Sequence, residues 1–426
     1  MSDTAARHEG RPALIAFDEA LSRLLSHAVP IGGIEEVPTL DAAQRVLAEP
    51  VVSPLSVPSW DNSQMDGYAV RCSDLLAVGN DGEAAPLRVS QRIAAGQEAL
   101  PLEPGTVARI FTGAAIPAGA DAVVMQEQAA AAGTDEAGVP LVRFSHLPAA
   151  GEWIRRTGED IEAGATVLPV GTRLTPQATG LAASVGAATL KVFRPIRVAC
   201  FFTGDELVMP GQPLPPGSIY NSNRFTLRGL IQALGGECDD LGIVADSLDA
   251  TRDALRRAAL RNDLIVTCGG VSVGEEDHLK PAVAAEGRLD LWSIAIKPGK
   301  PLAFGQVRRG DGSSAWFIGL PGNPVSSFIT FILAVRPFLL RLQGATALER
   351  RPIGLRADFD WLKPDRRREF LRVRRNDAGG LDLFANQGSG VLTSVFWADG
   401  LVDNPAGHVI RRGDTVAYLG LAELLS

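Results

Sequence analysis

Lysine is scarce in this chain of 426 residues, which has only five lysines among its 41 basic residues. Acidic residues number 49, so the formal net charge is −8 and gives no overall attraction to polyanions. This balance argues against bulk nucleic-acid binding and leaves room for a local basic pocket. Hydrophobic residues make up 46% of the chain and charged residues 21%, which excludes a fully disordered protein.

Cysteine is rare as well. The four cysteines are scattered, without a C-x-x-C pair or a histidine at metal-ligand spacing, so we expect no structural zinc site. The start of the chain has no basic segment followed by an apolar stretch, and no run approaches the ~18 apolar residues of a membrane span. We therefore expect a cytoplasmic protein that binds neither membrane nor nucleic acid.

The first half of the chain mixes short helices with β structure. Apolar residues at helical spacing predict an amphipathic helix from Ala13 to Ala28, and a second short helix is expected from Asp41 to Glu49. Residues 53–151 alternate short apolar runs with Gly/Pro turns, which predicts a small all-β insert. Thr175-Pro176 supplies an N-cap followed by proline at the first helical position, and opens a helix through about Val185.

After this helix, strand-like and helical runs alternate. The expected strands are Arg197 to Phe202, Glu237 to Val244, Asp263 to Cys268, Leu289 to Ile296 and Ala315 to Gly319. The expected helices are Asn223 to Leu234, Leu248 to Leu260, His278 to Glu286 and Pro324 to Leu342. This alternation predicts a doubly wound, mostly parallel α/β domain. From about Gly344 to Ser426 short strands and turns return, which predicts a C-terminal β-barrel or sandwich.

The loops that follow the expected strands are candidates for a binding site, because open α/β sheets bind ligands at the carboxyl ends of their strands. Gly269 and Gly270 would let backbone N–H groups approach an oxyanion, and Lys297 and Lys300 would supply positive charge. Neighbouring carboxylates imply a hard cation such as Mg²⁺. Each loop alone is more often a plain tight turn than a ligand-binding loop, and it is their convergence on one sheet edge that favours a site for an anion and a metal.

Two polar runs lie outside the expected sheet. Ser59 to Val70 and Gly151 to Ile161 taken alone are typical of a capped turn and an exposed ion-paired strand. Together with the loops, however, they resemble the molybdopterin molybdenumtransferases, the MoeA family, which includes the C-terminal domain of gephyrin. The matching stretches, in family order, are Asp61 to Ser63 with Met65 to Val70, Phe111 to Ala114, Arg155 to Ile161, Thr203 to Leu207, Gly269 to Glu275 with Asp277, Ile296 to Pro301 and Gly319 to Ser326. The tail, with Glu369 to Arg372 and Gln387 to Gly390, is a looser match.

The resemblance implies a four-part chain. The parts are a linker or dimer domain at 29–52 plus 152–180, a β insert at 53–151, a molybdopterin-binding α/β domain at 10–28 plus 181–340, and a C-terminal β domain at 341–426. It also implies a homodimer, with the active cleft between the α/β domain of one subunit and the β insert of its partner. A molybdopterin adenylyltransferase and molybdoenzyme maturation proteins are further candidate partners.

The resemblance implies a reaction too. Adenylylated molybdopterin and molybdate bind, molybdenum is placed on the dithiolene, and AMP is released with a divalent cation, usually Mg²⁺. We hypothesise that Gly269, Gly270 and Ser272 hold the phosphate or adenylate, and that Pro321 and Pro324 belong to the same binding region. Glu206, Asp246 and Asp277 would surround the metal, with Asp66, Thr112 and Asp160 approaching from the other domains. Lys297, Lys300, Ser326 and Arg372 would form the molybdate pocket.

Two alternatives stay open on the sequence. A molybdopterin adenylyltransferase would share the Gly-rich loop and consume ATP, but the large flanking β domains and the paired lysines disfavour it. A non-catalytic scaffold, as in gephyrin's receptor clustering, is disfavoured by the full set of charged motif residues. Gln64 and Phe202 depart from the common family pattern without removing a charged group, so we expect an active enzyme.

Overall fold

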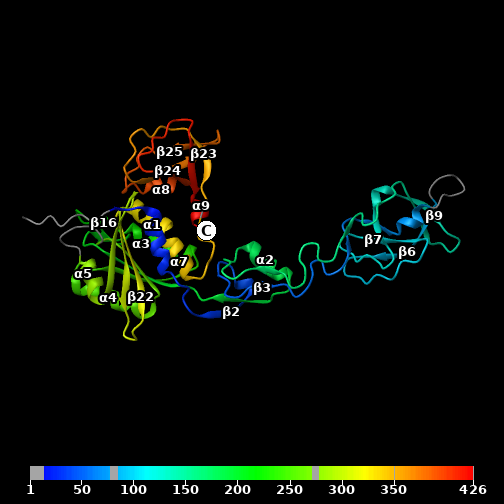
Figure 1. The fold of residues 1–426 in the computed structure, drawn as a ribbon, viewed down its shortest axis with the longest axis horizontal. Coiled ribbons are helices and arrows are strands. Elements are labelled where there is room, and N and C mark those ends of the chain that lie inside the picture. Colours follow the sequence, from blue (N-terminus) through cyan, green and yellow to red (C-terminus); the bar gives the residue numbers. More distant parts are fainter. Residues whose placement is uncertain (1–13, 77–84, 271–277, 350, 426) are drawn as a thin grey trace, which may run out of the picture. The chain divides into compact units, whose positions relative to one another are not determined.

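The computed structural model describes residues 14–76, 85–270, 278–349 and 351–425. The chain divides into two compact units (Figure 1). The larger unit consists of Met1–Glu49, Val170–Pro176 and Thr189–Ser426, and the smaller one of Pro50–Pro169 and Gln177–Ala188. The four-part division expected from the family resemblance stays a prediction.

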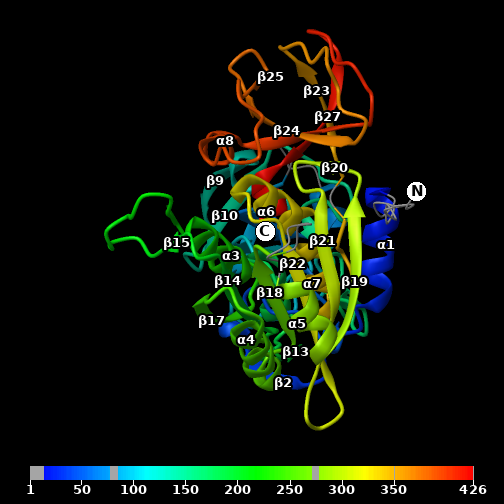
Figure 2. The ribbon, with the colours of Figure 1, turned by 90° about the vertical axis from the view of Figure 1, so that its left-hand side faces the viewer.

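A seven-stranded sheet forms the centre of the larger unit, with the order β1-β19-β21-β22-β18-β14-β17 (Figure 2). The strands are β1 (Leu14–Ile15), β14 (Arg197–Thr203), β17 (Glu237–Val244), β18 (Leu264–Cys268), β19 (Gly287–Ile294), β21 (Pro301–Arg308) and β22 (Ser314–Leu320). Four of the six pairings are parallel, and β21 is antiparallel to both its neighbours. The predicted mostly parallel sheet is confirmed, although the sequence analysis missed β21.

Helices cover both faces of this sheet. One face packs against α1 (Phe17–His27), α3 (Ser222–Ala233), α6 (Pro324–Thr330) and α7 (Arg336–Leu342), and the other against α4 (Leu248–Arg261) and α5 (Leu279–Glu286). Strand side chains alternate accordingly: in β14, Val198 and Cys200 join the first core and Ala199 and Phe201 the second. The sheet is therefore doubly wound, as predicted.

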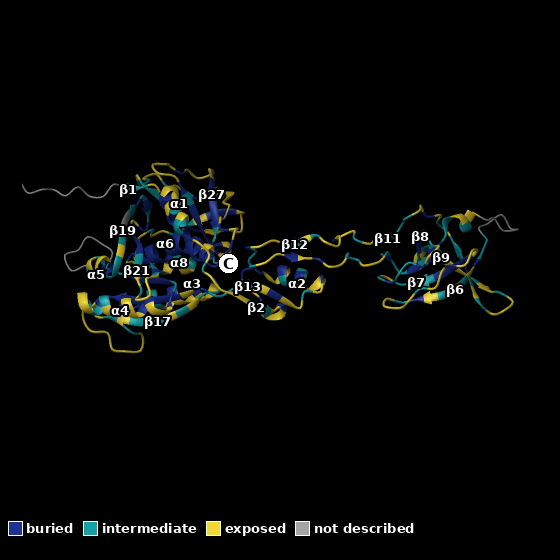
Figure 3. Cartoon of the chain, turned by 60° about the horizontal axis from the view of Figure 1, so that its bottom comes forward, coloured by how far each residue is buried: buried dark blue, intermediate teal, exposed yellow. Residues whose placement is uncertain are grey.

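The helical stretch Pro324–Leu342 is the most apolar long helix of the chain's described part. It consists of α6, a π-helical turn at Phe331–Val335, and α7. By length and composition it could cross a membrane, but 94% of its most apolar window is buried inside the unit (Figure 3). Packing against the sheet accounts for its apolar composition.

The start of the chain differs from the sequence prediction in two places. The first helix begins at Phe17 instead of Ala13, because Leu14–Ile15 is extended and pairs with β19. The predicted helix from Asp41 to Glu49 is wrong: only a short 3-10 turn, η1 (Thr39–Asp41), forms there. The backbone beyond it bonds to other segments, as Gln44 N donates to Leu174 O and Leu47 N to Thr172 O, so long-range bonds replace helical ones. Next to this segment, β2 (Ile34–Pro38) pairs with β13 (Thr189–Phe193).

The smaller unit is built on a six-stranded sheet, which confirms the predicted β insert. Its order is β8-β5-β7-β6-β10-β9, with β5 (Gly67–Val70), β6 (Leu87–Ile93), β7 (Thr106–Ile110), β8 (Ala122–Met125), β9 (Ala129–Thr134) and β10 (Pro140–Phe144). Shorter elements are β3 (Val51–Val52), β4 (Asn62–Ser63), η2 (Cys72–Leu76), η3 (Gln126–Gln128), β11 (Ile154–Arg155) and β12 (Thr166–Leu168). The helix expected after Thr175-Pro176 is α2 (Pro176–Ser184), which begins at the proline as predicted.

The C-terminal region of the larger unit is a small barrel, as the sequence predicted. Its strands are β23 (Ile353–Ala357), β24 (Arg368–Arg375), β25 (Gly380–Leu383), β26 (Gly400–Asn404) and β27 (Thr415–Gly420). β24 pairs with both β25 and β26, so these five strands close on themselves. A two-residue strand, β20 (Ile296–Lys297), pairs with β24 and so joins the lysine loop to the barrel. The other elements are β15 (Leu207–Val208), β16 (Ile219–Tyr220), α8 (Thr393–Trp397) and α9 (Leu421–Leu424).

Candidate functional site

A cavity of about 610 Å³ lies at the carboxyl edge of the seven-stranded sheet. The strands β14, β17, β18, β19 and β22 run in the same direction, so the loops that follow them meet at this edge. The predicted site residues that line the cavity are Glu206, Asp246, Gly269, Gly270, Lys297, Lys300, Pro321 and Ser326. The structure thus brings together loops that are separated by more than a hundred residues in the sequence.

Other predicted site residues lie elsewhere. Pro324 lines an adjoining cavity, and Arg372 is buried beside the main one. Ser272 and Asp277 fall outside the described residues. Asp66, Thr112 and Asp160 belong to the smaller unit, so their role at this site stays a prediction.

Gly269 lets the ends of β14 and β18 approach each other closely. Its φ of +102° lies in the left-handed region, and a Cβ on it would stand 2.8 Å from the backbone oxygen of Thr203. An L-amino acid side chain is therefore excluded on two grounds. The backbone N of Gly269 itself donates to Leu320 O at 3.2 Å, so the oxyanion-binding role of this loop stays a prediction.

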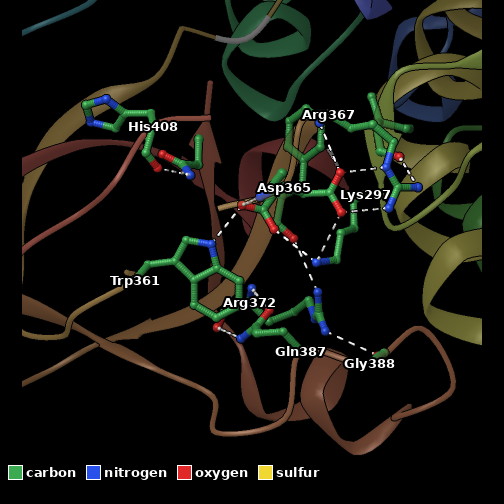
Figure 4. Close-up of polar contacts among 12 residues, drawn as sticks. Lys297, Trp361, Asp365, Arg367, Arg372, Gln387, Gly388 and His408 are labelled. Atoms are coloured by element: carbon green, nitrogen blue, oxygen red, sulfur yellow. Dashed lines mark hydrogen bonds and ion pairs between the residues drawn. The ribbon is translucent and has the colours of Figure 1, made fainter. Parts of the chain in front are cut away.

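The two lysines of the site are not equivalent. Lys297 Nζ lies 3.2 Å from Glu369 Oε1 and 3.5 Å from Asp365 Oδ2 (Figure 4). Lys300 is exposed and makes no ion pair with any residue that the structure describes. The charge of Lys297 is therefore shared with carboxylates of the protein, whereas the charge of Lys300 is available to a ligand.

Glu369 is the buried anchor of Lys297. Its side chain is 1% exposed, and it accepts hydrogen bonds from Trp361 Nε1 at 2.7 Å and from the backbone N of Asp365 at 3.0 Å. With Lys297, three donors surround the Glu369 carboxylate. Such a buried charge is stable only while it is paired and hydrogen-bonded, so Glu369 fixes the position of the lysine.

Arg367 brings a further cation to the cavity wall. Its Nε and Nη2 donate to the two carboxylate oxygens of Asp365, each at 2.9 Å. The Arg367 guanidinium holds the pKa of Asp365 well below its usual range, and burial opposes this effect only in part. Arg367 lines the cavity while Asp365 stays ionised behind it.

Arg372 supports the cavity wall from within the protein. It is 1% exposed, and it donates from Nη2 to Gly388 O at 3.3 Å and from its backbone N to Gln387 Oε1 at 2.9 Å. Burial lowers its pKa to about 10. Gln387 and Gly388 line the cavity, so Arg372 acts on the site through them in this structure. Its predicted direct place in the molybdate pocket stays a prediction.

Two carboxylates of the cavity fit a magnesium ion that is shared with a ligand. Glu206 and Asp246 both line the cavity. Within the described residues no group of three or more His, Cys, Asp or Glu side chains stands ready for a metal. Mg²⁺ is commonly held by one or two carboxylates together with substrate phosphates, so these residues suit that mode rather than an all-protein cage.

In the smaller unit, Asp66 and Thr112 are joined directly. Asp66 Oδ1 accepts hydrogen bonds from the backbone N of Thr112 at 2.8 Å and from its hydroxyl at 2.7 Å. These bonds lower the pKa of Asp66, so it is ionised at neutral pH. Arg92 and Arg109 lie over the Phe111 ring next to this pair, at 4.4 and 4.7 Å from its centroid. Asp160 stands apart from the pair, with its backbone N bonded to Val57 O.

The sequence analysis gave several residues of the cavity no individual role, although most of them lie in stretches that resemble the family. They include Thr203, Asn323, Arg367 and the segment Gln387 to Ser389. Arg367 and the 387–389 segment come from the barrel, whose family resemblance was loose. The pairing of β20 with β24 brings them to the lysine loop, and no local sequence pattern reports that pairing.

A doubly wound sheet with a polar cavity at its carboxyl edge, containing a glycine turn, lysines and carboxylates, is typical of α/β proteins that bind phosphate-like oxyanions. The chain matches three family models: MoeA N-terminal region (domain I and II) over residues 15–186, probable molybdopterin binding domain over 199–341, and MoeA C-terminal region (domain IV) over 355–421.

Known proteins agree with these matches. The molybdopterin molybdenumtransferase of Haemophilus influenzae is 43% identical over 342 residues, which cover 80% of each chain. That of a Nostoc species is 37% identical over 406 residues, covering 90% of this chain and 91% of the relative. The crystal structure of a molybdopterin biosynthesis MoeA protein from Pyrococcus horikoshii superposes with a TM-score of 0.74 and 32% identity, over 95% of this chain and 98% of that one. The chain belongs to the MoeA family of molybdopterin molybdenumtransferases.

Proposed function

We propose that this protein inserts molybdenum into adenylylated molybdopterin and releases AMP, a transferase step of molybdenum cofactor biosynthesis. The cavity that joins Lys300 to the Gly269 turn is the single observation that carries this conclusion at the level of the site. Molybdate, a dianionic oxyanion, and a phosphate-linked substrate each need positive charge and N–H donors. The same cavity supplies positive charge and N–H donors.

The residues of the cavity divide this work. Lys300 binds molybdate through its unshared charge. Lys297 lies in the same loop, and Glu369 holds its ammonium group in place as a second cation of the site. The Gly269 turn receives the phosphate groups, and Ser326 adds a hydroxyl donor at the cavity wall. No protein nucleophile is required, because the acceptor dithiolene belongs to the substrate.

Glu206 and Asp246 would hold Mg²⁺ together with the phosphates. When bound, the ion would neutralise phosphate charge and stabilise AMP as it leaves. Asp246 and Glu206 also keep the phosphate region of the cavity acidic, so an anionic ligand is disfavoured there without a cation.

We also propose a cytoplasmic homodimer in which Asp66 and Thr112 of one subunit serve the site of the other. The fixed, ionised Asp66 supports a role beyond a simple turn, since both bonds from Thr112 stabilise the carboxylate. An adenylyltransferase that supplies the substrate and maturation proteins that take the cofactor are the expected partners.

The purified protein with adenylylated molybdopterin, molybdate and Mg²⁺ should release AMP and incorporate molybdenum. Lys300→Ala and Asp66→Ala should each abolish insertion and keep the fold, as measured by circular dichroism. Lys191→Ala is the matched control, because Lys191 pairs with Glu49 on the surface, outside the cavity. Adenylate formation from ATP and molybdopterin without molybdenum insertion would refute the proposal. Normal insertion by Lys300→Ala or by Asp66→Ala would refute the role proposed for the residue that was replaced.

A further inference from the structure

Arg109 connects the segments that surround Asp66 in the smaller unit. It lies in β7, directly opposite Tyr68 of the neighbouring strand β5. Its Nη1 donates to Gly67 O at 2.9 Å, and its Nη2 donates to Gln126 Oε1 at 2.6 Å. The backbone N of Gln126 in turn donates to Asp66 O at 3.0 Å. One guanidinium thus restrains two consecutive carbonyl groups, that of Gly67 directly and that of Asp66 through Gln126.

The same guanidinium contacts the residue before Thr112. Its Cζ lies 4.7 Å from the centroid of the Phe111 ring, within the range of a cation–π interaction. Phe111 immediately precedes Thr112, whose backbone N and hydroxyl both donate to Asp66 Oδ1. Arg109 therefore contacts the chain next to both members of the pair, at the start of β5 for Asp66 and at the Phe111 ring for Thr112.

The charge of Arg109 acts in the same direction as its bonds. The hydrogen bonds from Thr112 are the main reason why the pKa of Asp66 is lowered, and the positive charge of Arg109 lowers it further. The guanidinium thus favours the ionised carboxylate that accepts the two bonds from Thr112.

Arg92 offers a close comparison with Arg109. It lies opposite Arg109 in β6, and its Cζ is 4.4 Å from the centroid of the same Phe111 ring. It makes no hydrogen bond or ion pair with any residue that the structure describes. The two arginines share the ring, but only Arg109 bonds to the segments around Asp66, so a comparison of the two separates these bonds from the ring contact.

We propose that Arg109 is a positioning residue of the transferase, which holds the Asp66 carboxylate and the Thr112 hydroxyl together in the orientation that the reaction uses. This inference rests on the proposed function, because that function gives Asp66 and Thr112 their role in molybdenum insertion. Both terminal nitrogens of Arg109 donate to acceptors of the protein, so Arg109 acts through the pair and not on the substrate.

Hydrogen exchange of the full chain without substrate gives the first test. The variants are Arg109→Met, Gln126→Ala and, as the matched control, Arg92→Met. Exchange of the Thr112 amide, followed by mass spectrometry of overlapping peptides, reports whether this N–H still donates to Asp66. We expect about tenfold faster exchange in Arg109→Met, as for the loss of hydrogen bonds from a charged group, and a smaller increase in Gln126→Ala. Arg92→Met should exchange like the wild type.

The kinetics of molybdenum insertion give the second test. In Arg109→Met, kcat should fall about tenfold while KM for molybdate stays within about twofold, because molybdate binds at Lys300 in the proposed function. A general loss of structure would not separate kcat from KM in this way. Gln126 is exposed, so Gln126→Ala keeps the fold and should still lower kcat, by a smaller factor. This variant keeps the test valid if Arg109→Met fails to fold.

Two results would overturn the inference. One is exchange at the wild-type rate at Thr112 in every folded variant of Arg109 and Gln126, and the other is an equal fall in kcat in Arg92→Met and Arg109→Met. If the wild type inserts molybdenum in either case, the proposed function stands without this role for Arg109. If the wild type inserts no molybdenum, the proposed function fails, and faster Thr112 exchange in Arg109→Met would still support the positioning of the pair by Arg109.

Discussion

Removal of the Lys297 ammonium is expected to destabilise the fold, whereas removal of the Lys300 ammonium is not. Lys297→Ala takes one of three donors and the nearest cation from Glu369, whose side chain is 1% exposed. Breaking a fully buried ion pair costs about 3–5 kcal/mol. The Lys297 side chain is 37% exposed and two donors remain on Glu369, so we expect a smaller loss, of about 1–2 kcal/mol.

Urea denaturation and thermal unfolding of both variants give the measurement. A loss of 1–2 kcal/mol corresponds to a fall in melting temperature of roughly 2–3 °C for a unit of this size. Lys300→Ala should stay within about 0.5 kcal/mol of the wild type, because its side chain is exposed and makes no ion pair among the described residues.

A double-mutant cycle isolates the contact. In the background of Glu369→Gln, which removes the buried charge, Lys297→Ala should cost less than about 0.5 kcal/mol. Equal destabilisation by the two lysine variants would refute the reasoning, and so would an equal cost of Lys297→Ala in both backgrounds. Either result would mean that the buried charge of Glu369 is not stabilised by Lys297.

Three further predictions test other parts of the structure. Hydrogen bonds to Arg367 are the main reason why the pKa of Asp365 is lowered in the folded protein. The ionised side chain therefore stabilises the fold fully above its ordinary pKa of 3.8, and this contribution is lost as the pH falls through the folded pKa. Urea titrations from pH 6 to 3 should show that the difference in unfolding free energy between wild type and Asp365→Asn narrows below about pH 4. Gly269→Ala should lower stability by about 1–3 kcal/mol and abolish AMP release, because the turn has a φ of +102°; an unchanged melting temperature would contradict the strain. In the proposed homodimer, a mixed dimer of Asp66→Ala with Lys300→Ala contains one complete shared site, which should restore about half of the wild-type insertion rate; inactive mixed dimers would show that each site lies within one subunit.

The regular part of the fold could be predicted from the sequence because its elements are set by local patterns. The alternation of buried β14 and β18 with amphipathic α3 and α4 appears as a change of hydrophobic period, and the strand bounds agree to within a residue or two. The predicted helix from Asp41 to Glu49 does not form, and the reason is physical. Its backbone bonds to residues 172–174, and such long-range bonds leave no mark on local spacing.

The candidate site likewise has residues that local patterns predict and contacts that only long-range pairing creates. Glu206, Asp246 and Lys300 could be predicted, because each follows one of the parallel strands and those strands end at one edge of the sheet. The ion pair of Lys297 with Glu369 could not, since it joins residues 72 positions apart through the pairing of a two-residue strand with the barrel. Ser272 and Asp277 lie outside the described residues and stay predictions.

The unequal lysines explain how one loop can contain two cations at a site that also holds carboxylates. Two unshared ammonium groups three residues apart would repel each other, and each would be drawn toward Glu206 and Asp246. Pairing Lys297 with a buried glutamate neutralises this repulsion and keeps its ammonium group in one place. Lys300 then retains a charge that responds to the ligand. In the proposed function, this separation of charge lets one part of the cavity attract an oxyanion and another part hold a cation with phosphate.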